Sequence, residues 1–349
     1  MKTLKIGFVG VGFMGQMAHL RNYVDLEGCD VTAIAELCGD VREQVARRYA
    51  IPNAYETAAE MMERERLDGV VASQPFNRHG IIVPELMRYG VPVFTEKPLA
   101  ASIQTGECIV EAVDRSGTFL MVGYHKRSDP AIEWAVAEIK RLKATKELGD
   151  MTYIRVLMPN GDWIANGGIG VIRNVGDAPT LDVDPPDPDM DAEAYQRYGA
   201  FVNFYIHQVN LIRHLLDEAY HVTYADPNGV LLAGTSASGV TCAIEMAPYS
   251  TSIAWQEEVL VCFKRGWLKI ALPAPLAVNR PGKVQVFHDP GDGATPRWQE
   301  PQMPYEHAMR RQAKNFLAAI RGDIPPRCSA AEALEDLHLA LAYRRMMSA

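Results

Sequence analysis

A glycine-rich turn near the start of the chain has the spacing of a dinucleotide-binding site. The motif Gly10-x-Gly12-x-x-Gly15 follows the apolar run 4–9 and precedes a stretch of helical composition that reaches residue 23. In such a turn one glycine permits a tight bend, one lets the backbone approach a pyrophosphate, and one lets the helix pack closely on the strand. We therefore predict that a dinucleotide binds here, with contacts from Gly10, Gly12, Phe13, Met14 and Gly15.

An acidic residue at the end of the next apolar run favours NAD over NADP. Glu36 follows residues 31–35, where dinucleotide-binding units carry the carboxylate that hydrogen-bonds the adenosine ribose. Its charge repels a 2′-phosphate, and the neighbours Leu37 and Cys38 supply no arginine that would bind one. The alternative reading of Glu36 is a solvated carboxylate at a strand end.

A second group of candidate residues shares one helix. The stretch 201–216 is mostly apolar, yet it carries four polar residues at spacings of four, three and four, namely Asn203, His207, Asn210 and His214. This spacing puts the four side chains on one helical face. A narrow polar stripe on a helix otherwise suited to burial indicates a lined cavity. The alternative is solvent exposure or structural hydrogen bonding, which for His214 is the better reading.

The elements that must position these residues alternate between strand and helix in the first third of the chain. Stretches of helical composition separate five apolar runs, at residues 4–9, 31–35, 69–72, 91–95 and 119–122. Such alternation predicts a parallel, doubly wound sheet with helices on its faces. Lys97 follows one of these runs, and residues just beyond the C-terminal edge of such a sheet lie in its ligand-binding crevice. A surface lysine before a proline turn is the alternative.

The pattern changes after residue 124, where a long helical stretch gives way to successive β-like runs joined by tight turns. We therefore predict two domains. Residues 1–123 form an NAD-binding α/β Rossmann domain with a doubly wound parallel sheet. Residues 124–349 form a second domain of the α+β class around a large, mostly antiparallel sheet. Residues 159–199 are rich in Gly, Pro and Asp and are too long for a connector, which indicates a lid or an oligomer arm.

Composition excludes several functional classes. The 349 residues are 48% hydrophobic and 22% charged, as in ordinary globular proteins. The net charge of −8 offers no basic field for nucleic acid or for an anionic membrane. Apolar segments are broken well before the roughly 18 residues of a membrane span. No export signal is visible, and the cysteines show no C-x-x-C pair or zinc-ligand spacing, so we expect a cytoplasmic protein without a metal site.

Residues 96–98 read Glu-Lys-Pro and directly follow an apolar run. With this motif the sequence resembles the glucose-fructose oxidoreductase, inositol 2-dehydrogenase and MocA (Gfo/Idh/MocA) family, whose signature it is. Residues 73–79, Ser-Gln-Pro-Phe-Asn-Arg-His, resemble the family's Thr-Pro-Asn-x-x-His turn, and residues 122–127 are similar to its strand end that enters the second domain. The order and spacing of these segments also match, and the resemblance covers nearly the whole chain apart from residues 159–199.

The resemblance implies roles for individual residues. In the family an Asp-x-x-x-His pair completes the active site with the lysine. Here the pair reads Asn203 and His207, so the histidine matches and the carboxylate does not. Lys97 and His207 are then the catalytic residues, while Asn203, which takes no proton at neutral pH, would orient His207 or bind a substrate hydroxyl. Beyond the glycine turn, the implied cofactor pocket comprises Glu36, Ser73, Gln74, Pro75, Asn77, His79, Glu96 and Lys97.

Substrate-binding residues are expected where the chain enters the second domain, at the start of the excursion and on the polar helix. Asp162 and Trp163 offer a carboxylate and a flat apolar face to a sugar ring, although packing is the commoner use of such an aromatic residue. The predicted set is Tyr124, His125, Arg127, Asp162, Trp163, Asn203 and His207.

These residues together predict hydride transfer between the nicotinamide of NAD(H) and a secondary carbinol of a sugar, sugar derivative, glycoside or cyclitol. The alternative is a redox-neutral glycosidase or lyase, in which a transient keto-sugar allows a leaving group to be eliminated before the hydride returns. Residues 159–199 could then accommodate a bulky aglycone. A third reading is a non-catalytic NAD sensor, against which the presence of Lys97 and His207 argues. The resemblance also implies that residues 124–349 are a substrate-binding and oligomerisation domain. Its open-faced sheet would pack against its copy in a homodimer or homotetramer.

Overall fold

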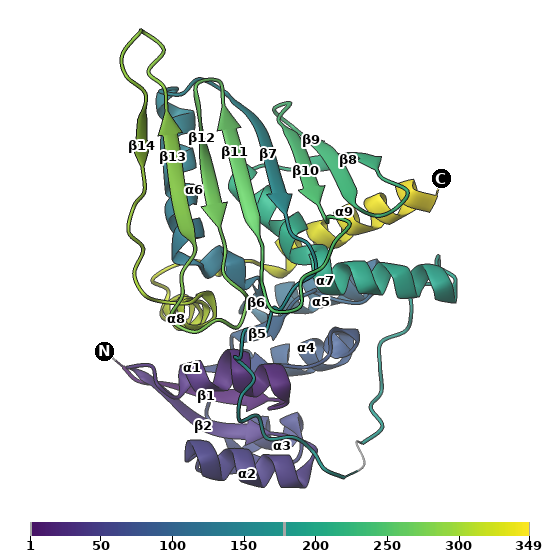
Figure 1. Cartoon of the computed structure of the whole chain (residues 1–349). Coiled ribbons are helices and arrows are strands. Elements are labelled where there is room, and N and C mark those ends of the chain that lie inside the picture. Colours follow the sequence, from purple (N-terminus) through teal and green to yellow (C-terminus); the bar gives the residue numbers. More distant parts are fainter. Residues whose placement is uncertain (1, 177–178, 349) are drawn as a thin grey trace. The chain divides into compact units, whose positions relative to one another are not determined.

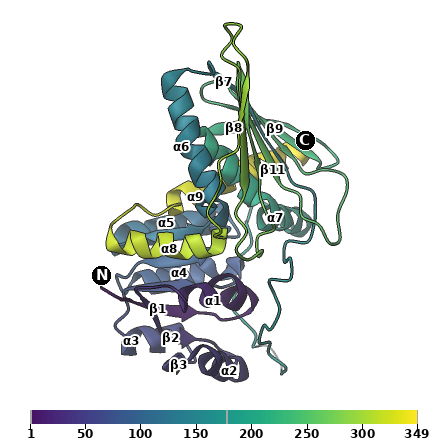
Figure 2. The same ribbon diagram turned by 60° about the vertical axis from the view of Figure 1, so that its left-hand side comes forward.

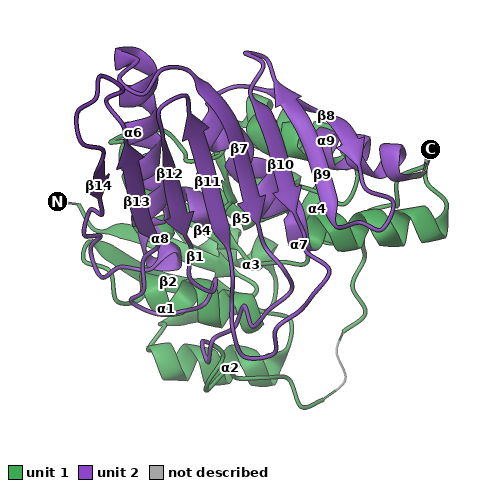
Figure 3. Cartoon of the chain, turned by 45° about the horizontal axis from the view of Figure 1, so that its top comes forward, with its two compact units in different colours: residues 1–124, 168–203, 312–337 green, residues 125–167, 204–311, 338–349 purple. Residues whose placement is uncertain are grey.

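The chain forms two compact units in a computed structural model that describes residues 2–176 and 179–348. Figure 3 colours the two units separately. Unit 1 comprises Met1–Tyr124, Gly168–Asn203 and Gln312–Leu337. Unit 2 comprises His125–Gly167, Phe204–Arg311 and His338–Ala349.

This division differs from the predicted one, which assigns all residues after 123 to one continuous domain. Two later segments belong to unit 1. The first hydrogen-bonds to residues near the glycine turn, since the side chain of Gln16 pairs with the backbone of Ile172. The second places Phe316 in the unit 1 core, with its ring centroid 5.8 Å from that of Phe94. Both attachments depend on long-range packing, which no boundary signal along the sequence marks.

Unit 1 is built on a six-stranded sheet in the order β3-β2-β1-β4-β5-β6 (Figure 1). Every neighbouring pair of strands is parallel. The strands are β1 (Leu4–Val9), β2 (Cys29–Ala35), β3 (Asn53–Tyr55), β4 (Gly69–Ala72), β5 (Val93–Glu96) and β6 (Leu120–Gly123). The predicted parallel, doubly wound sheet is confirmed.

Helices cover the faces of this sheet, which explains why β4, β5 and β6 are buried along their whole length and are mostly apolar. Thr57 and Ser102 cap two of these helices by accepting a backbone N–H three residues on. The helices are α1 (Arg21–Tyr23), α2 (Gly39–Tyr49), α3 (Ala58–Arg64), α4 (His79–Met87) and α5 (Ile103–Ser116).

The strand order reverses between β1 and β4. The chain proceeds from β1 toward one edge of the sheet through β2 and β3, and then returns to β4 on the other side of β1. At such a switch point the carboxyl ends of the two strands border a crevice, the usual ligand site of open α/β sheets. The glycine turn 10–15 follows β1, and the segment 73–78 follows β4.

Unit 2 is built on an eight-stranded sheet in the order β14-β13-β12-β11-β7-β10-β9-β8. Among the described strands of this sheet, β7 and β10 form the only parallel pair. The sheet is therefore mostly antiparallel, as predicted. The strands are β7 (Met151–Leu157), β8 (Tyr220–Ala225), β9 (Leu231–Ser236), β10 (Thr241–Glu245), β11 (Glu258–Phe263), β12 (Gly266–Ala271), β13 (Lys283–His288) and β14 (Arg297–Gln299).

Burial alternates along this sheet, because one face is covered and the other is open. In β11 every second residue is buried, beginning with Val259. Helix α6 (Pro130–Thr145) packs against β12 and β13. Figure 2 shows α6 on one face of the sheet. Helices α7 (Ala192–Leu216), α8 (Ala308–Arg321) and α9 (Ala330–Ser348) each contribute residues to both units.

Hydropathy along the helices bears on membrane insertion. Across residues 2–176 and 179–348, none of the helices combines the length and the apolar character that crossing a bilayer demands.

Candidate active site

The glycine turn is shaped by close contacts at two of its three glycines. Gly10 has φ of +85°, and a Cβ there would lie 2.5 Å from the carbonyl oxygen of Ser73. A Cβ on Gly15 would lie 2.6 Å from the carbonyl oxygen of Gly10. The fold itself therefore requires glycine at both positions.

Gly12 differs, because nothing in the protein requires a glycine there. Its φ lies outside the left-handed region, and a Cβ would have no described atom within 4 Å. The backbone at Gly12 therefore borders open space at the switch point, where a pyrophosphate needs close approach to the chain. This is the structural evidence that the turn fits a dinucleotide.

Glu36 lies directly beside this turn. Its Oε2 accepts the N–H of Val11 at 3.0 Å and its Oε1 accepts the N–H of Cys38 at 3.0 Å. The carboxylate is thereby fixed at the end of β2, where an adenosine ribose is bound in folds of this type. Arg42 donates to the backbone carbonyl of Glu36 at 2.6 Å and not to its carboxylate.

Glu96 is the last residue of β5, and Lys97 follows it in the Glu-Lys-Pro loop. Glu96 is buried, and its Oε1 lies 2.6 Å from Nε2 of His19. Burial alone would raise the pKa of Glu96, but the hydrogen bond from His19 and the charges of His19 and Lys97 outweigh it and hold this pKa below its usual range. Glu96 is therefore an ionised anchor beneath the loop.

His79 holds the same loop from the other side. It is fully buried, and its Nδ1 lies 3.1 Å from the carbonyl oxygens of both Pro98 and Leu99. Its Nε2 lies 3.1 Å from Oγ1 of Thr95. Burial lowers the pKa of His79, against the raising effect of the carbonyl partners, so the imidazole is neutral at pH 7. His79 thus positions the Lys97 loop.

The segment after β4 contributes the remaining predicted cofactor residues. The N–H of Ser73 donates to the carbonyl of Val9 at 2.9 Å, which continues the pairing of β4 with β1. The side chain of Gln74 faces the glycine turn, because its amide nitrogen would lie 2.3 Å from a Cβ on Gly10. Pro75 is exposed. Asn77 is half-buried, and so are Phe13 and Met14 in the glycine turn.

Lys97 hydrogen-bonds to the polar helix. Its side chain is half-buried, and Nζ donates to the backbone carbonyl of Asn203 at 2.5 Å. Asn203 lies in α7 and its side chain is exposed. His207 follows Asn203 by one turn of the same unbroken helix. The end of β5 is therefore tied to the helix that carries the predicted histidine.

His207 and Arg127 differ in their surroundings within unit 2. The His207 ring lies edge-on to His125, with ring centroids 4.6 Å apart. Arg127 is buried, and its Nε donates to Oδ1 of Asn210 at 2.8 Å. Asn210, the third member of the polar stripe, is therefore a structural partner of Arg127. A substrate contact from Arg127 stays a prediction, as does one from the buried Tyr124.

Asp162 and Trp163 lie in a turn of unit 2 whose backbone is well bonded. Oδ1 of Asp162 accepts the N–H groups of Ile164 and Ala165, each at 3.0 Å. The carbonyl of Trp163 accepts the N–H of Leu276 at 3.2 Å. The Asp162 carboxylate thus stabilises its own turn, which favours the structural alternative for this pair.

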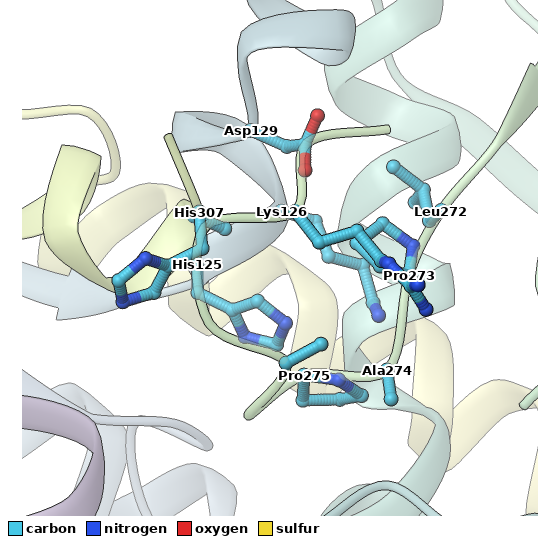
Figure 4. A pocket seen from close by; sticks show the side chains of 11 residues that line it. His125, Lys126, Asp129, Leu272, Pro273, Ala274, Pro275 and His307 are labelled. Carbon is cyan, nitrogen blue, oxygen red and sulfur yellow. The ribbon is translucent and has the colours of Figure 1, made fainter. Parts of the chain in front are cut away.

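A small cavity lies in unit 2 beside His125 (Figure 4). Lys126, Asp129 and His307 also line it, and its volume of about 10 Å³ has room for about one water molecule. Burial raises the pKa of Asp129 to about 6, against the opposing hydrogen bonds from the N–H groups of Ala131 and Gly282. The cavity is too small to hold a sugar.

Sequence reasoning did not single out three polar side chains for which the structure shows specific contacts. Gln16 is completely buried and bonds to the backbone at Val11 and Ile172. The guanidinium of Arg173 lies over the ring of Phe13. Lys126 forms a buried ion pair with Glu257. Of the three, only Gln16 has a signal in the sequence, because it is a polar residue directly after the third glycine of the motif.

Comparison with known proteins agrees with this geometry. Residues 4–124 match the family model described as an oxidoreductase family with an NAD-binding Rossmann fold. These residues are therefore similar to the Rossmann domains of the Gfo/Idh/MocA oxidoreductases. The match covers the whole sheet of unit 1, including the glycine turn and the Glu-Lys-Pro loop.

The chain is also similar to curated proteins and to solved structures. The rhizopine catabolism protein MocA of Rhizobium meliloti is 24% identical over 353 aligned positions, which cover 100% of this chain and 96% of MocA. An NAD(+)-dependent scyllo-inositol 2-dehydrogenase of Bacillus subtilis is 28% identical over 153 residues, or 44% of this chain and 43% of that enzyme. A crystal structure titled as a putative NADPH-dependent oxidoreductase of Desulfitobacterium hafniense superposes with a TM-score of 0.75 at 15% identity, covering 99% of this chain and 95% of that one. At this identity, the superposition shows that the two chains share a fold.

Proposed function

We propose that this chain is a Gfo/Idh/MocA oxidoreductase that transfers hydride between the nicotinamide of NAD(H) and a secondary carbinol of a sugar, sugar derivative, glycoside or cyclitol. The observation that carries the proposal is the hydrogen bond from Lys97 to Asn203, which ties the end of β5 to the helix of His207. Relatives named for rhizopine catabolism and inositol dehydrogenation support the substrate class.

The protein's part in this reaction is proton handling and alignment. When bound, NAD supplies the hydride acceptor at the nicotinamide ring. His207 accepts the proton of the substrate hydroxyl in the oxidative direction. Lys97 donates a hydrogen bond to the same oxygen and stabilises the negative charge that develops on it. The two residues could exchange these roles, since each can hold a proton at its nitrogen.

Asn203 gives this site a neutral amide in place of the family's carboxylate. Its backbone carbonyl holds Lys97, and its exposed side chain can donate and accept hydrogen bonds without carrying charge. We propose that the Asn203 amide binds a substrate hydroxyl, while no proton passes through it.

The proposed function is tested by incubating the protein with NAD and a panel of sugars, glycosides and cyclitols, with absorbance at the nicotinamide band and product mass as readouts. We expect NADH and a product lighter by two hydrogens with at least one compound. Release of an aglycone without net NADH would instead identify the redox-neutral reaction. No turnover of any compound would count against both.

Gly12 provides the control for cofactor dependence. Gly12→Ala is expected to leave the melting temperature unchanged, because no described atom lies within 4 Å of the added Cβ. It should weaken NAD binding by about tenfold or more, equivalent to about 1.4 kcal/mol, because the methyl group occupies the approach to the pyrophosphate. Gly199→Ala is the matched control, since its Cβ also meets nothing within 4 Å. Equal NAD affinity in the two variants would contradict the assignment.

We further propose a homodimer or homotetramer formed through the open face of the unit 2 sheet. Trp267, Phe287 and Trp298 gather at one end of this sheet, with ring centroids 5.0 to 5.9 Å apart. Trp298 is 65% exposed, which is unusual for so large an apolar side chain. Sedimentation at micromolar concentration should show an oligomer, and Trp298→Glu should shift it toward monomer. A native monomer would exclude this assembly.

A further inference from the structure

The segment that follows residue 167 attaches to unit 1 beside the glycine turn. Nε2 of Gln16 donates to the carbonyl of Ile172 at 2.8 Å, and the N–H of Ile172 donates to Oε1 of Gln16 at 2.9 Å. Gln16 is completely buried, so this reciprocal pair is shielded from water. Arg48 of α2 adds a hydrogen bond to the carbonyl of Gly170.

The same segment attaches again on the β4 side of the switch point. Nε of Arg78 donates to the carbonyl of Asp182 at 2.9 Å. The N–H of Asp184 donates to the carbonyl of Asn77 at 2.6 Å. The Asp184 carboxylate in turn accepts the N–H of Gly80 at 3.0 Å, at the start of α4. We call residues 168–176 and 182–187, which carry these attachments, the strap.

The two attachments lie on opposite sides of the predicted dinucleotide crevice. Gln16 follows the turn after β1, and Asn77 and Arg78 belong to the turn after β4. These strands are neighbours at the point where the strand order reverses. The strap is therefore fixed at both borders of the crevice in which folds of this type bind their cofactor.

Arg173 is the charged side chain that the strap brings to the glycine turn. Its Cζ lies 5.7 Å from the ring centroid of Phe13, the residue directly after Gly12. A contact with a ring face uses none of the five N–H donors of the guanidinium. The space at Gly12 is nevertheless open within 4 Å, so the strap flanks the position of the pyrophosphate without filling it.

We propose that Arg173 is a cofactor-binding residue, whose guanidinium donates to the pyrophosphate of the dinucleotide from the strap. A planar guanidinium matches two phosphate oxygens, and Phe13 keeps it oriented toward them. The Gln16–Ile172 pair positions Arg173 by fixing the backbone of the preceding residue. The proposal rests on the dinucleotide site of the proposed function, to which it adds a ligand from a segment outside the βαβ unit.

The experiment measures dissociation constants by calorimetric titration of the full chain with NAD and with ADP-ribose, which keeps the pyrophosphate but lacks nicotinamide. Arg173→Ala should weaken both ligands equally, by about 10- to 100-fold, the scale of a charge-assisted hydrogen bond. Its affinity should also depend less on ionic strength than that of the native protein. Arg48→Ala is the matched control, because it removes an exposed strap contact away from Phe13, and it should change affinity by no more than about threefold.

Three results of the titrations would contradict the role of Arg173. Unchanged affinity in Arg173→Ala would overturn the role of Arg173, while native binding of NAD and ADP-ribose would leave the dinucleotide site intact. A loss confined to NAD would also overturn it, because the contact would then lie at the nicotinamide half. Failure of the native protein to bind either ligand would overturn this proposal together with the proposed function.

Discussion

Lys97→Met and His207→Ala are each expected to lower turnover by about 10²- to 10⁴-fold, the usual scale for a positioned acid or base. Lys97 directly follows β5 and donates to the carbonyl of Asn203, while His207 lies one turn further along α7. Methionine keeps the half-buried aliphatic stem of Lys97 and removes only the charge and the donors. The fold of the loop should therefore survive, because His79 and Glu96 hold it independently of the ammonium group.

The binding of NAD separates a catalytic role from a structural one. Both variants should bind NAD within about threefold of the native protein, as expected when the lost interaction arises only in the transition state. The double variant should lose less than the product of the two single effects, because two groups acting on one proton are not additive. Lys140→Met removes an exposed lysine of α6 as a control. Native turnover in either single variant would require a different proton acceptor.

Lys126→Met is expected to destabilise the protein by about 3 to 5 kcal/mol, because it leaves the charge of Glu257 buried and unpaired. The Lys126 Nζ to Glu257 Oε2 distance is 2.6 Å, and the two side chains are 5% and 0% exposed. Gln208 donates to the other oxygen of Glu257 at 2.8 Å, and the ammonium lies over the ring of Trp255 at 5.8 Å. Every partner of the pair is thus inside unit 2.

A more exposed ion pair between the neighbouring strands β11 and β12 provides the matched control. Lys269 and Glu258 are 2.9 Å apart with side chains 43% and 28% exposed, so Lys269→Met should cost no more than about 1 kcal/mol. Urea unfolding followed by circular dichroism measures both variants. The double variant Lys126→Met with Glu257→Leu should recover most of the loss, since it leaves no buried charge. Equal stabilities of Lys126→Met and Lys269→Met would contradict the assignment of a buried pair.

The fold of unit 1 could be predicted from local sequence patterns, and the family resemblance implied the same fold. Strands and helices alternate because apolar periodicity and glycine placement act over a few residues, and parallel neighbours follow from the crossovers between them. Gly10 and Gly15 could be recognised because steric contacts within one turn demand glycine. Glu36 and Lys97 could be located because each directly follows a strand of the parallel sheet.

The sequence by itself thus determined the elements, the parallel sheet and the residues at its carboxyl edge, since these depend on contacts between near neighbours along the chain. Only the tertiary structure decided which distant residues meet. Gln16 and Ile172 are 156 positions apart, and Lys126 and Glu257 are 131 positions apart. No local spacing encodes such pairs, because they form only when separately folded elements pack and bury their polar groups together. For the same reason, the segments 168–203 and 312–337 join unit 1, although the sequence places them far from its strands.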